Sequence, residues 1–102
     1  MTFFNAVYEI VKKIPFGRVV SYGDIALALG SIKFSRQVGW ALHANPSQSE
    51  IPCYRVVNKV GQVSKAFVFG GENCQRRLLE NEGVIFDEKG LVKPCFFWKI
   101  SL

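Results

Sequence analysis

The sequence predicts a mainly α-helical fold with small β elements, a single domain over residues 1–102 of the winged helix-turn-helix kind. Apolar residues recur at helical spacing in four stretches, each bounded by a capping residue, a proline or a glycine. Short β-branched runs lie between some of these stretches. A chain of 102 residues has room for one hydrophobic core, and 49% of its residues are apolar.

The first two helices are expected near the N-terminus. Thr2 can cap a helix that Pro15 ends. The apolar face of this helix is formed by Phe3, Val7, Ile10, Val11 and Ile14. Ser21 and Asp24 have the spacing of a capping box, which predicts a second, short helix that runs to residue 29 and stops at Gly30.

A brief turn over residues 31–33 leads to a third helix, an arrangement typical of a helix-turn-helix. Its core face is expected to hold Phe34, Val38, Ala41 and Leu42. The opposite face carries Arg36, Gly39, Trp40 and His43. A cation, an aromatic ring and a glycine on one stripe suit a nucleic-acid groove. The alternative is an ordinary solvated face, with Trp40 tucked against a neighbouring segment.

A fourth helix is predicted over residues 72–82, with Gly83 as its C-terminal stop. Cys74, Leu78 and Glu82 share one face of it. A carboxylate on a core-facing stripe needs a partner; otherwise the last turn frays and Glu82 meets water. Residues 84–86 and 91–92 are expected to form a small hairpin.

Composition excludes several classes of protein. Three cysteines about twenty residues apart, one histidine and no C-x-x-C pair argue against a zinc site or a disulfide framework. No metal or other cofactor is implied, and Cys74 and Cys95 are expected to be core thiols. No membrane span and no secretory signal are visible, so a cytoplasmic location is expected. The net charge of +5 mildly favours a polyanionic partner.

Five segments together carry a resemblance to a known family: S-Y-G at 21–23, R-Q-V-G at 36–39, N-P at 45–46, I-P-C-Y-R-V at 51–56 and L-L-E-N-E-G at 78–83. The asparagine follows the arginine by nine residues, and the cysteine follows the asparagine by eight. The chain resembles the DNA-binding, cysteine-bearing domain of the O6-alkylguanine-DNA alkyltransferases over residues 4–98.

The resemblance implies suicidal DNA repair, in which a flipped guanine gives its O6-alkyl group irreversibly to Cys53. Arg36 would fill the gap left by the base, and Tyr22 would press on the phosphate of the target nucleotide. Asn45 would hold the turn between the recognition helix and the active-site strand. In this family the helix-turn-helix enters the minor groove.

Ser21, Gly39 and Trp40 complete the expected DNA-contacting set. The implied partner is double-stranded DNA that contains O6-alkylguanine, and no cofactor is needed because donor and acceptor are both in the complex. The protein would be a monomer that works at the nucleoid of a bacterium or in the nucleus of a eukaryote.

The chain departs from the family beside the cysteine. The usual residue there is histidine, which relays the thiol proton through water towards a glutamate that corresponds to Glu82, whereas this chain has Tyr54. A phenol with a pKa near 10 cannot accept a proton as an imidazole does. Transfer should therefore be slowed rather than abolished, because a few per cent of free cysteine is thiolate at neutral pH. Tyr54 could instead pass a hydrogen bond within a water chain from Cys53 to Glu82.

Two other functions stay open. The short chain also resembles the alkyltransferase-like proteins, which bind alkylated DNA without reacting and flag it for excision-repair proteins. Those relatives generally have another residue in place of the cysteine, so Cys53 favours an enzyme and Tyr54 favours a sensor. A DNA-binding regulator of another kind is the third possibility. The loop 64–69 is bulkier and more apolar than the family's usual loop, which leaves the pocket shape open.

Overall fold

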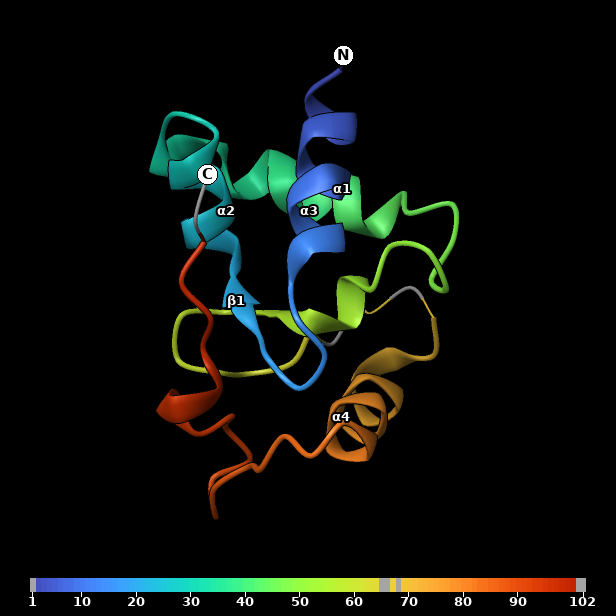
Figure 1. Ribbon diagram of the computed structural model, residues 1–102, viewed down its shortest axis with the longest axis vertical. Coiled ribbons are helices and arrows are strands. Elements are labelled where there is room, and N and C mark those ends of the chain that lie inside the picture. The colour runs from blue at the N-terminus through green and yellow to red at the C-terminus, as the bar shows by residue number, and fades with distance from the viewer. Residues whose placement is uncertain (1, 65–66, 68, 101–102) are drawn as a thin grey trace.

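The computed structural model describes residues 2–64, 67 and 69–100. Along this part of the chain, helices alternate with two very short strands (Figure 1). The elements run in the order α1 (Phe3–Lys13), β1 (Val20–Ser21), α2 (Tyr22–Ala28), η1 (Ile32–Phe34), α3 (Ser35–His43), η2 (Cys53–Arg55), β2 (Val56–Val57), α4 (Gly71–Asn81) and η3 (Pro94–Phe96), where η marks a 3-10 turn. The mainly helical fold with small β elements is confirmed.

The predicted helix starts are confirmed by their caps. The Thr2 hydroxyl oxygen accepts a hydrogen bond of 3.1 Å from the Asn5 N–H, at the start of α1. The Ser21 hydroxyl oxygen accepts one of 3.0 Å from the Asp24 N–H, at the start of α2. Each bond satisfies a backbone donor that the first helical turn leaves without an intrahelical partner.

The first three helices pack on one another around a common core. Apolar faces of α1, α2 and α3 meet there, and the segment that carries Cys53 closes the core from below (Figure 1). The fully buried side chains from the three helices are Val7, Val11, Ile25, Ala26, Val38 and Ala41. This packing holds α3 against the segment in which the predicted nucleophile lies.

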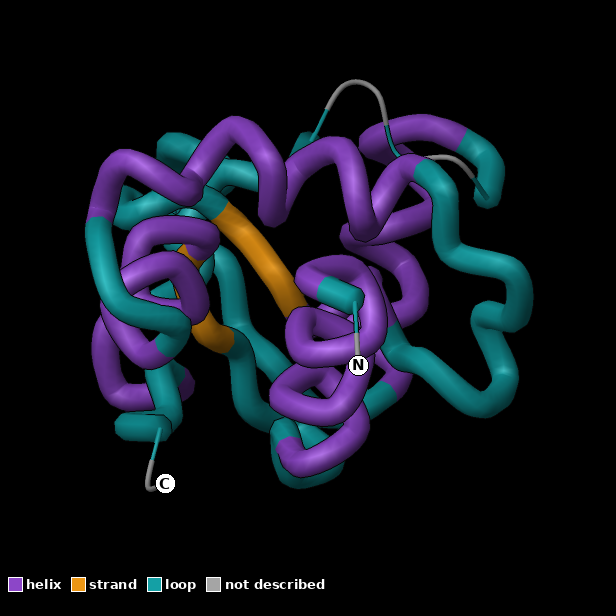
Figure 2. Tube along the Cα trace, turned by 90° about the horizontal axis from the view of Figure 1, so that it is seen from above, coloured by secondary structure: helices purple, strands orange, loops and turns teal. Residues whose placement is uncertain are grey.

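The two strands connect this core to a second one. β1 pairs in parallel with β2, with Val20 opposite Val56 and Ser21 opposite Val57. Because strand side chains alternate, Val20 and Val56 enter the first core, while Val57 enters a smaller cluster with Leu79 of α4. The strands thus lie enclosed among helices and loops (Figure 2).

The C-terminal segment lies beside β1. The Val19 N–H donates to the Phe96 carbonyl at 2.9 Å, and the Trp98 N–H donates to the Val19 carbonyl at 2.8 Å. In Figure 1 this segment returns along β1 towards α2. Of the described helices, none is long and apolar enough to cross a bilayer.

The small hairpin over 84–86 and 91–92 is present in short form. It has one antiparallel bridge between Phe86 and Val92, and Asp87 accepts backbone hydrogen bonds that hold the connection as a tight turn. Two other local expectations were wrong. Phe34 is 36% exposed, because the chain forms the η1 turn there and α3 begins one residue later. Cys95 is exposed on η3 rather than in the core.

Candidate functional site

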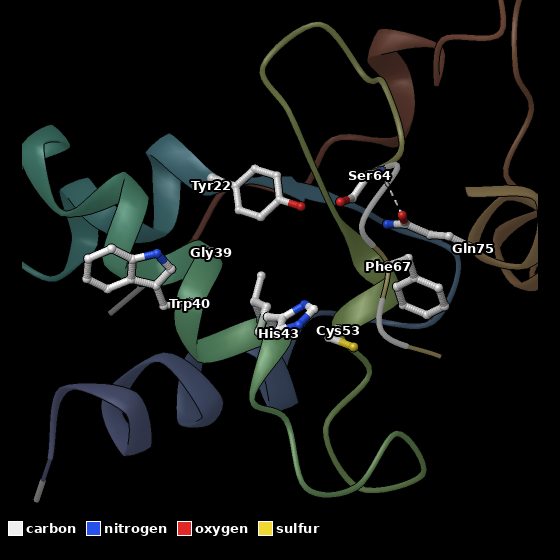
Figure 3. Close-up of a pocket in the computed structure, with 9 residues that line it drawn as sticks. Tyr22, Gly39, Trp40, His43, Cys53, Ser64, Phe67 and Gln75 are labelled. Atoms are coloured by element: carbon white, nitrogen blue, oxygen red, sulfur yellow. Dashed lines mark hydrogen bonds between the residues drawn. The ribbon is translucent and has the colours of Figure 1, made fainter. Parts of the chain in front are cut away.

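Cys53 lies at the inner end of a pocket of about 290 Å³ (Figure 3). Pro52 leads into η2, whose first residue is Cys53, and the next residues enter β2. The cysteine is only 4% exposed, yet its side chain forms part of the pocket wall. The other lining residues are Tyr22, Gly39, Trp40, Leu42, His43, Ser64, Phe67 and Gln75. The predicted nucleophile therefore faces α3, on the side of the polar stripe formed by Arg36, Gly39, Trp40 and His43.

Asn45 joins the end of α3 to the cysteine segment. The buried amide donates to the Ile51 carbonyl at 2.8 Å and accepts from the Ser47 N–H at 2.9 Å, which closes the loop between α3 and η2. Burial raises the pKa of the Cys53 thiol, and hydrogen bonds from the Asn45 side chain and the Cys53 backbone offset part of this rise. The catalytic role expected of Asn45 stays a prediction.

Glu82 accepts hydrogen bonds from three residues in two segments of the chain. Its carboxylate accepts from the Gly17 N–H at 2.8 Å, from the Tyr54 hydroxyl at 2.5 Å and from Arg55 Nη2 at 2.8 Å. Arg55 Nη1 also donates to the Ile14 carbonyl at 2.9 Å. The side chains of the ion pair are 13% and 5% exposed, so Glu82 has the partner that its place on a core-facing stripe required.

These contacts fix the protonation of Tyr54 and Glu82. Burial, followed by the hydrogen bond to Glu82, raises the pKa of Tyr54 to about 12. Burial alone would raise the pKa of Glu82, but hydrogen bonds from Arg55, Tyr54 and the Gly17 N–H lower it instead. Tyr54 is therefore a neutral donor to a carboxylate and has no capacity to accept the thiol proton.

Neither Tyr54 nor Glu82 is among the described residues that line the pocket. Both lie on the side of η2 that faces α4 and the turn after α1. The structure thus brings Tyr54 and Glu82 together but separates both from the pocket that Cys53 faces. The suggested water chain from Cys53 through Tyr54 to Glu82 stays a prediction.

The polar stripe of α3 divides into two parts. Gly39, Trp40 and His43 line the pocket, whereas Arg36 lies exposed on the first turn of α3, outside the lining. Trp40 is 56% exposed, so the alternative in which its ring is tucked against a neighbour is wrong. A Cβ added to Gly39 would meet no heavy atom within 4 Å, so packing within the described protein does not require a glycine there.

Tyr22 and Ser21 have different surroundings, although they are adjacent. The Tyr22 ring lines the pocket, and its hydroxyl points towards Ser64 (Figure 3). Burial raises the pKa of Tyr22, a hydrogen bond with Ser64 opposes this, and the nearby Cys53 adds to the rise. Ser21 is buried, and its hydroxyl caps α2. The DNA contacts expected of both residues stay predictions.

Gln75 is a site residue that the sequence analysis missed. It is 1% exposed; its amide oxygen accepts from the Ser64 N–H at 2.9 Å, and its amide nitrogen donates to the Tyr54 and Val56 carbonyls at 3.1 and 2.9 Å. It therefore ties the start of loop 64–69 to the cysteine segment; residues 65, 66 and 68 of that loop lie outside the described residues. Its i, i+4 spacing with the buried Leu79 is the signal that could have identified it.

The arrangement suits a covalent reaction at sulfur more than metal chemistry. Among the described residues, no group of three or more histidine, cysteine, aspartate or glutamate side chains could hold a metal ion. The pocket instead presents one thiol, two hydroxyl-bearing side chains and several apolar walls. Fold and site together define a helix-turn-helix protein whose recognition helix faces a cysteine in a pocket.

Comparison with known proteins specifies this class further. Residues 2–84 match the family described as 6-O-methylguanine DNA methyltransferase, DNA binding domain. The chain belongs to this family, as the sequence predicted.

The relatives differ in how much of their length the chain spans. Alkyltransferase-like protein 1 of Schizosaccharomyces pombe is 38% identical, over 95% of this chain and 94% of that protein. The methylated-DNA–protein-cysteine methyltransferase of Haemophilus influenzae is 33% identical over 95% of this chain but only 54% of its own length. The chain thus spans about half of that methyltransferase.

The fold likeness includes proteins solved with DNA. A crystal structure of S. pombe Atl1 in complex with damaged DNA containing O6-carboxymethylguanine superimposes with a TM-score of 0.79 at 37% identity, over 95% of this chain and 94% of that one. The complex of Mycobacterium tuberculosis OGT with DNA gives 0.74 at 36% identity, over 81% and 49%.

The ion pair at Glu82 predicts a specific loss of stability. Glu82→Gln removes the charge that Arg55 faces in a nearly buried place, so we expect the free energy of unfolding at pH 7 to fall by about 3 kcal/mol. Because the folded pKa of Glu82 lies below its unfolded value, this stability is present above pH ~4.3 and is lost as the pH falls through the folded pKa. Urea denaturation at pH 7 and at pH 3 measures both effects.

Glu80→Gln is the matched control on the same helix. Glu80 pairs with Arg76 at 3.4 Å, but both side chains are 43% or more exposed, so the loss should stay within about 0.5 kcal/mol. Two outcomes would contradict a stabilising role for the buried charge of Glu82. One is an equal loss of unfolding free energy in the two variants, and the other is a loss in Glu82→Gln that is as large at pH 3 as at pH 7.

Proposed function

We propose that this protein repairs DNA by taking an O6-alkylguanine out of the duplex and transferring the alkyl group irreversibly to Cys53. The observation that carries the proposal is the Cys53 side chain in the wall of a pocket that also includes Gly39, Trp40 and His43 of α3. A helix that contacts DNA through this face would present an extruded base to the sulfur. The proposed location is the cytoplasm, at the nucleoid of a bacterium, or the nucleus of a eukaryote.

The size and walls of the pocket suit one base. Pockets for drug-sized ligands are about 300–1,000 Å³, and this one, at about 290 Å³, is at the small end. Phe67 and Leu42 offer apolar surface to a planar ring, and Tyr22 and Ser64 bring hydroxyl groups to the pocket wall. A flipped base is read in this way, by apolar stacking and a few hydrogen bonds.

The chemical step is a displacement at carbon. The Cys53 thiolate attacks the alkyl carbon, the new S–C bond forms, and the C–O6 bond breaks with its electron pair on the guanine oxygen. The thiol gives up one proton, and the released guanine gains one, so charge and atoms balance. The carbon stays on sulfur, which limits each protein molecule to one turnover.

Burial slows this step. A free cysteine is a few per cent thiolate at pH 7, and the raised pKa of Cys53 lowers that fraction. General-base help is worth about 10²- to 10⁴-fold, and Tyr54 does not supply it. A protein that reacts once tolerates a slow step, provided that it holds the lesion long enough.

DNA binding is supported by charge, by α3 and by relatives. The chain carries a net charge of +5, and Arg36 lies exposed at the start of the helix that leads into the pocket. Similar proteins have been solved with DNA, and a protein of Escherichia coli named DNA base-flipping protein is 39% identical over 89% of this chain and 69% of its own length.

A lesion sensor is the second candidate. Alkyltransferase-like protein 1 matches over nearly its whole length, and the thiol of Cys53 lacks the usual neighbouring imidazole. In this role the protein would bind O6-alkylguanine DNA with the same surfaces and leave it unchanged, so that excision-repair proteins could act.

Intact mass distinguishes the two candidates. After incubation with duplex DNA containing O6-methylguanine, we expect the protein to gain the mass of one methyl group, located by peptide mass spectrometry on Cys53. Cys53→Ala should gain none and should still bind the duplex. Tight lesion-selective binding of the wild-type protein with no mass change, even after hours, would favour the sensor.

Arg36 is predicted to stabilise the extruded state. Arg36→Ala should weaken binding to O6-methylguanine duplex by 10-fold or more, about 1.4 kcal/mol, because nothing would fill the space left by the base. Arg77→Ala on α4 removes the same charge elsewhere and is the control. Fluorescence anisotropy at one salt concentration measures both, and equal losses would argue against a role in base extrusion.

Gly39 is predicted to lower the free energy of unfolding and to allow DNA to approach α3 closely. Glycine in a helix interior destabilises by about 0.5–1 kcal/mol relative to alanine, and a Cβ at Gly39 meets open space. Gly39→Ala should therefore raise the free energy of unfolding by about that amount and weaken DNA binding. A more stable variant with unchanged affinity would show that DNA does not approach the helix there.

A further inference from the structure

The thiol of Cys53 needs a proton acceptor that its neighbours in sequence do not provide. The Tyr54 hydroxyl donates to Glu82, and the Glu82 carboxylate is already occupied by Arg55, Tyr54 and the Gly17 N–H. Both lie outside the described lining of the pocket. A proton acceptor therefore has to come from the other residues that line the pocket with Cys53.

His43 is in that position. It is the last residue of α3, it lines the pocket together with Cys53, and its imidazole is turned towards the cysteine end of the pocket in Figure 3. It is also the sole histidine among the 102 residues of the chain. A neutral imidazole has a free lone pair and accepts a proton at neutral pH.

We propose that His43 accepts the thiol proton of Cys53, directly or through one water, when the sulfur attacks an electrophilic carbon in the pocket. The inference rests on the proposed alkyl transfer and identifies its general base. The S–H bond breaks, the proton moves to an imidazole nitrogen, and the sulfur keeps the electron pair that forms the S–C bond. The proton then balances the one that the released guanine gains.

The other titratable groups near the pocket do not compete for this role. Tyr22 lines it and Tyr8 of α1 donates to the Ala41 carbonyl at 2.7 Å; burial, with a smaller contribution from Cys53, raises the pKa of each above 10. Both phenols stay protonated at neutral pH. Among the described lining residues, His43 alone belongs to a type that changes charge between pH 5 and 8.

The charged groups on the neighbouring elements are few. Arg36 shares the polar stripe of α3 with His43 but lies two turns away. On α1, Glu9 and Lys12 pair with each other at 3.2 Å and line a separate hollow with Pro46 and Ile51.

The experiment measures thiol reactivity without DNA. Wild-type protein and His43→Gln are treated with iodoacetamide between pH 5 and 10, and peptide mass spectrometry follows Cys53 and Cys95 separately. Cys95 is exposed on η3 and serves as an internal control in the same tube. We expect Cys53 of the variant to react about 10²-fold more slowly at pH 7 and to approach the wild-type rate at pH 10, with Cys95 unchanged.

Chemical rescue separates proton transfer from packing. Added imidazole should restore part of the Cys53 rate in His43→Ala and leave the wild-type rate unchanged, which a merely structural role would not predict. Equal Cys53 rates in wild type and His43→Gln at pH 7, including equally slow ones, would overturn the inference. So would a slow variant that imidazole does not rescue.

A matching measurement of methyl transfer keeps the two proposals apart. If wild-type protein takes methyl from O6-methylguanine DNA and His43→Gln does so at the same rate, the proposed function stands and the role of His43 is wrong. If no transfer occurs but the thiol shows the expected dependence on His43, the base is present and the proposed reaction is wrong.

Discussion

Glu82 determines how the cysteine segment is held. Its carboxylate accepts hydrogen bonds from the Gly17 N–H in the turn after α1 and from Tyr54 and Arg55 of η2. Gly17 permits this approach, since a Cβ there would lie 3.1 Å from the Glu82 carbonyl oxygen and its φ is +78°. Because Tyr54 and Arg55 are fixed on this side, the preceding residue, Cys53, is directed to the opposite side and into the pocket.

The same cluster changes the chemistry available to the thiol. Tyr54 reaches Glu82, but a side chain acts as a general base only if it takes up a proton at neutral pH, and a phenol with a pKa of about 12 does not. Tyr54 therefore supplies a structural hydrogen bond to Glu82 and no general base. The apolar walls that would hold a purine also raise the pKa of the thiol, so the pocket favours binding the base and disfavours ionising the sulfur. The proposed proton acceptor on α3, His43, would let the same pocket hold a purine and ionise the thiol.

The helices and the family were predictable because their signals are local. Thr2 and Ser21 each precede an apolar face by one turn, and the motif from Arg36 to Cys53 depends only on spacing. The sequence indicated that the Glu82 carboxylate needs a partner. It did not indicate that Arg55 and Gly17 are the partners, since they lie 27 and 65 residues before Glu82 in the chain. Gln75 was missed because the inner face of α4 was placed one residue away, at Cys74. His43 is exposed on the groove-facing side of α3, as expected, but its place in the same pocket as Cys53 was not predictable, because it depends on the loop that Asn45 closes.

The two proposed functions, enzyme and sensor, need the same architecture. They differ in whether alkyl transfer to Cys53 is faster or slower than dissociation of the lesion. Under either proposal the pocket, the α3 face and Arg36 would hold the lesion, which would leave the pocket either by dissociation or by giving up its alkyl group to Cys53. Residence times of complexes range from milliseconds to days, so a thiol that reacts slowly still completes the transfer if the complex outlives it. In the proposed reaction, a longer residence of the base in the pocket therefore compensates for the lower thiolate fraction that burial of Cys53 causes.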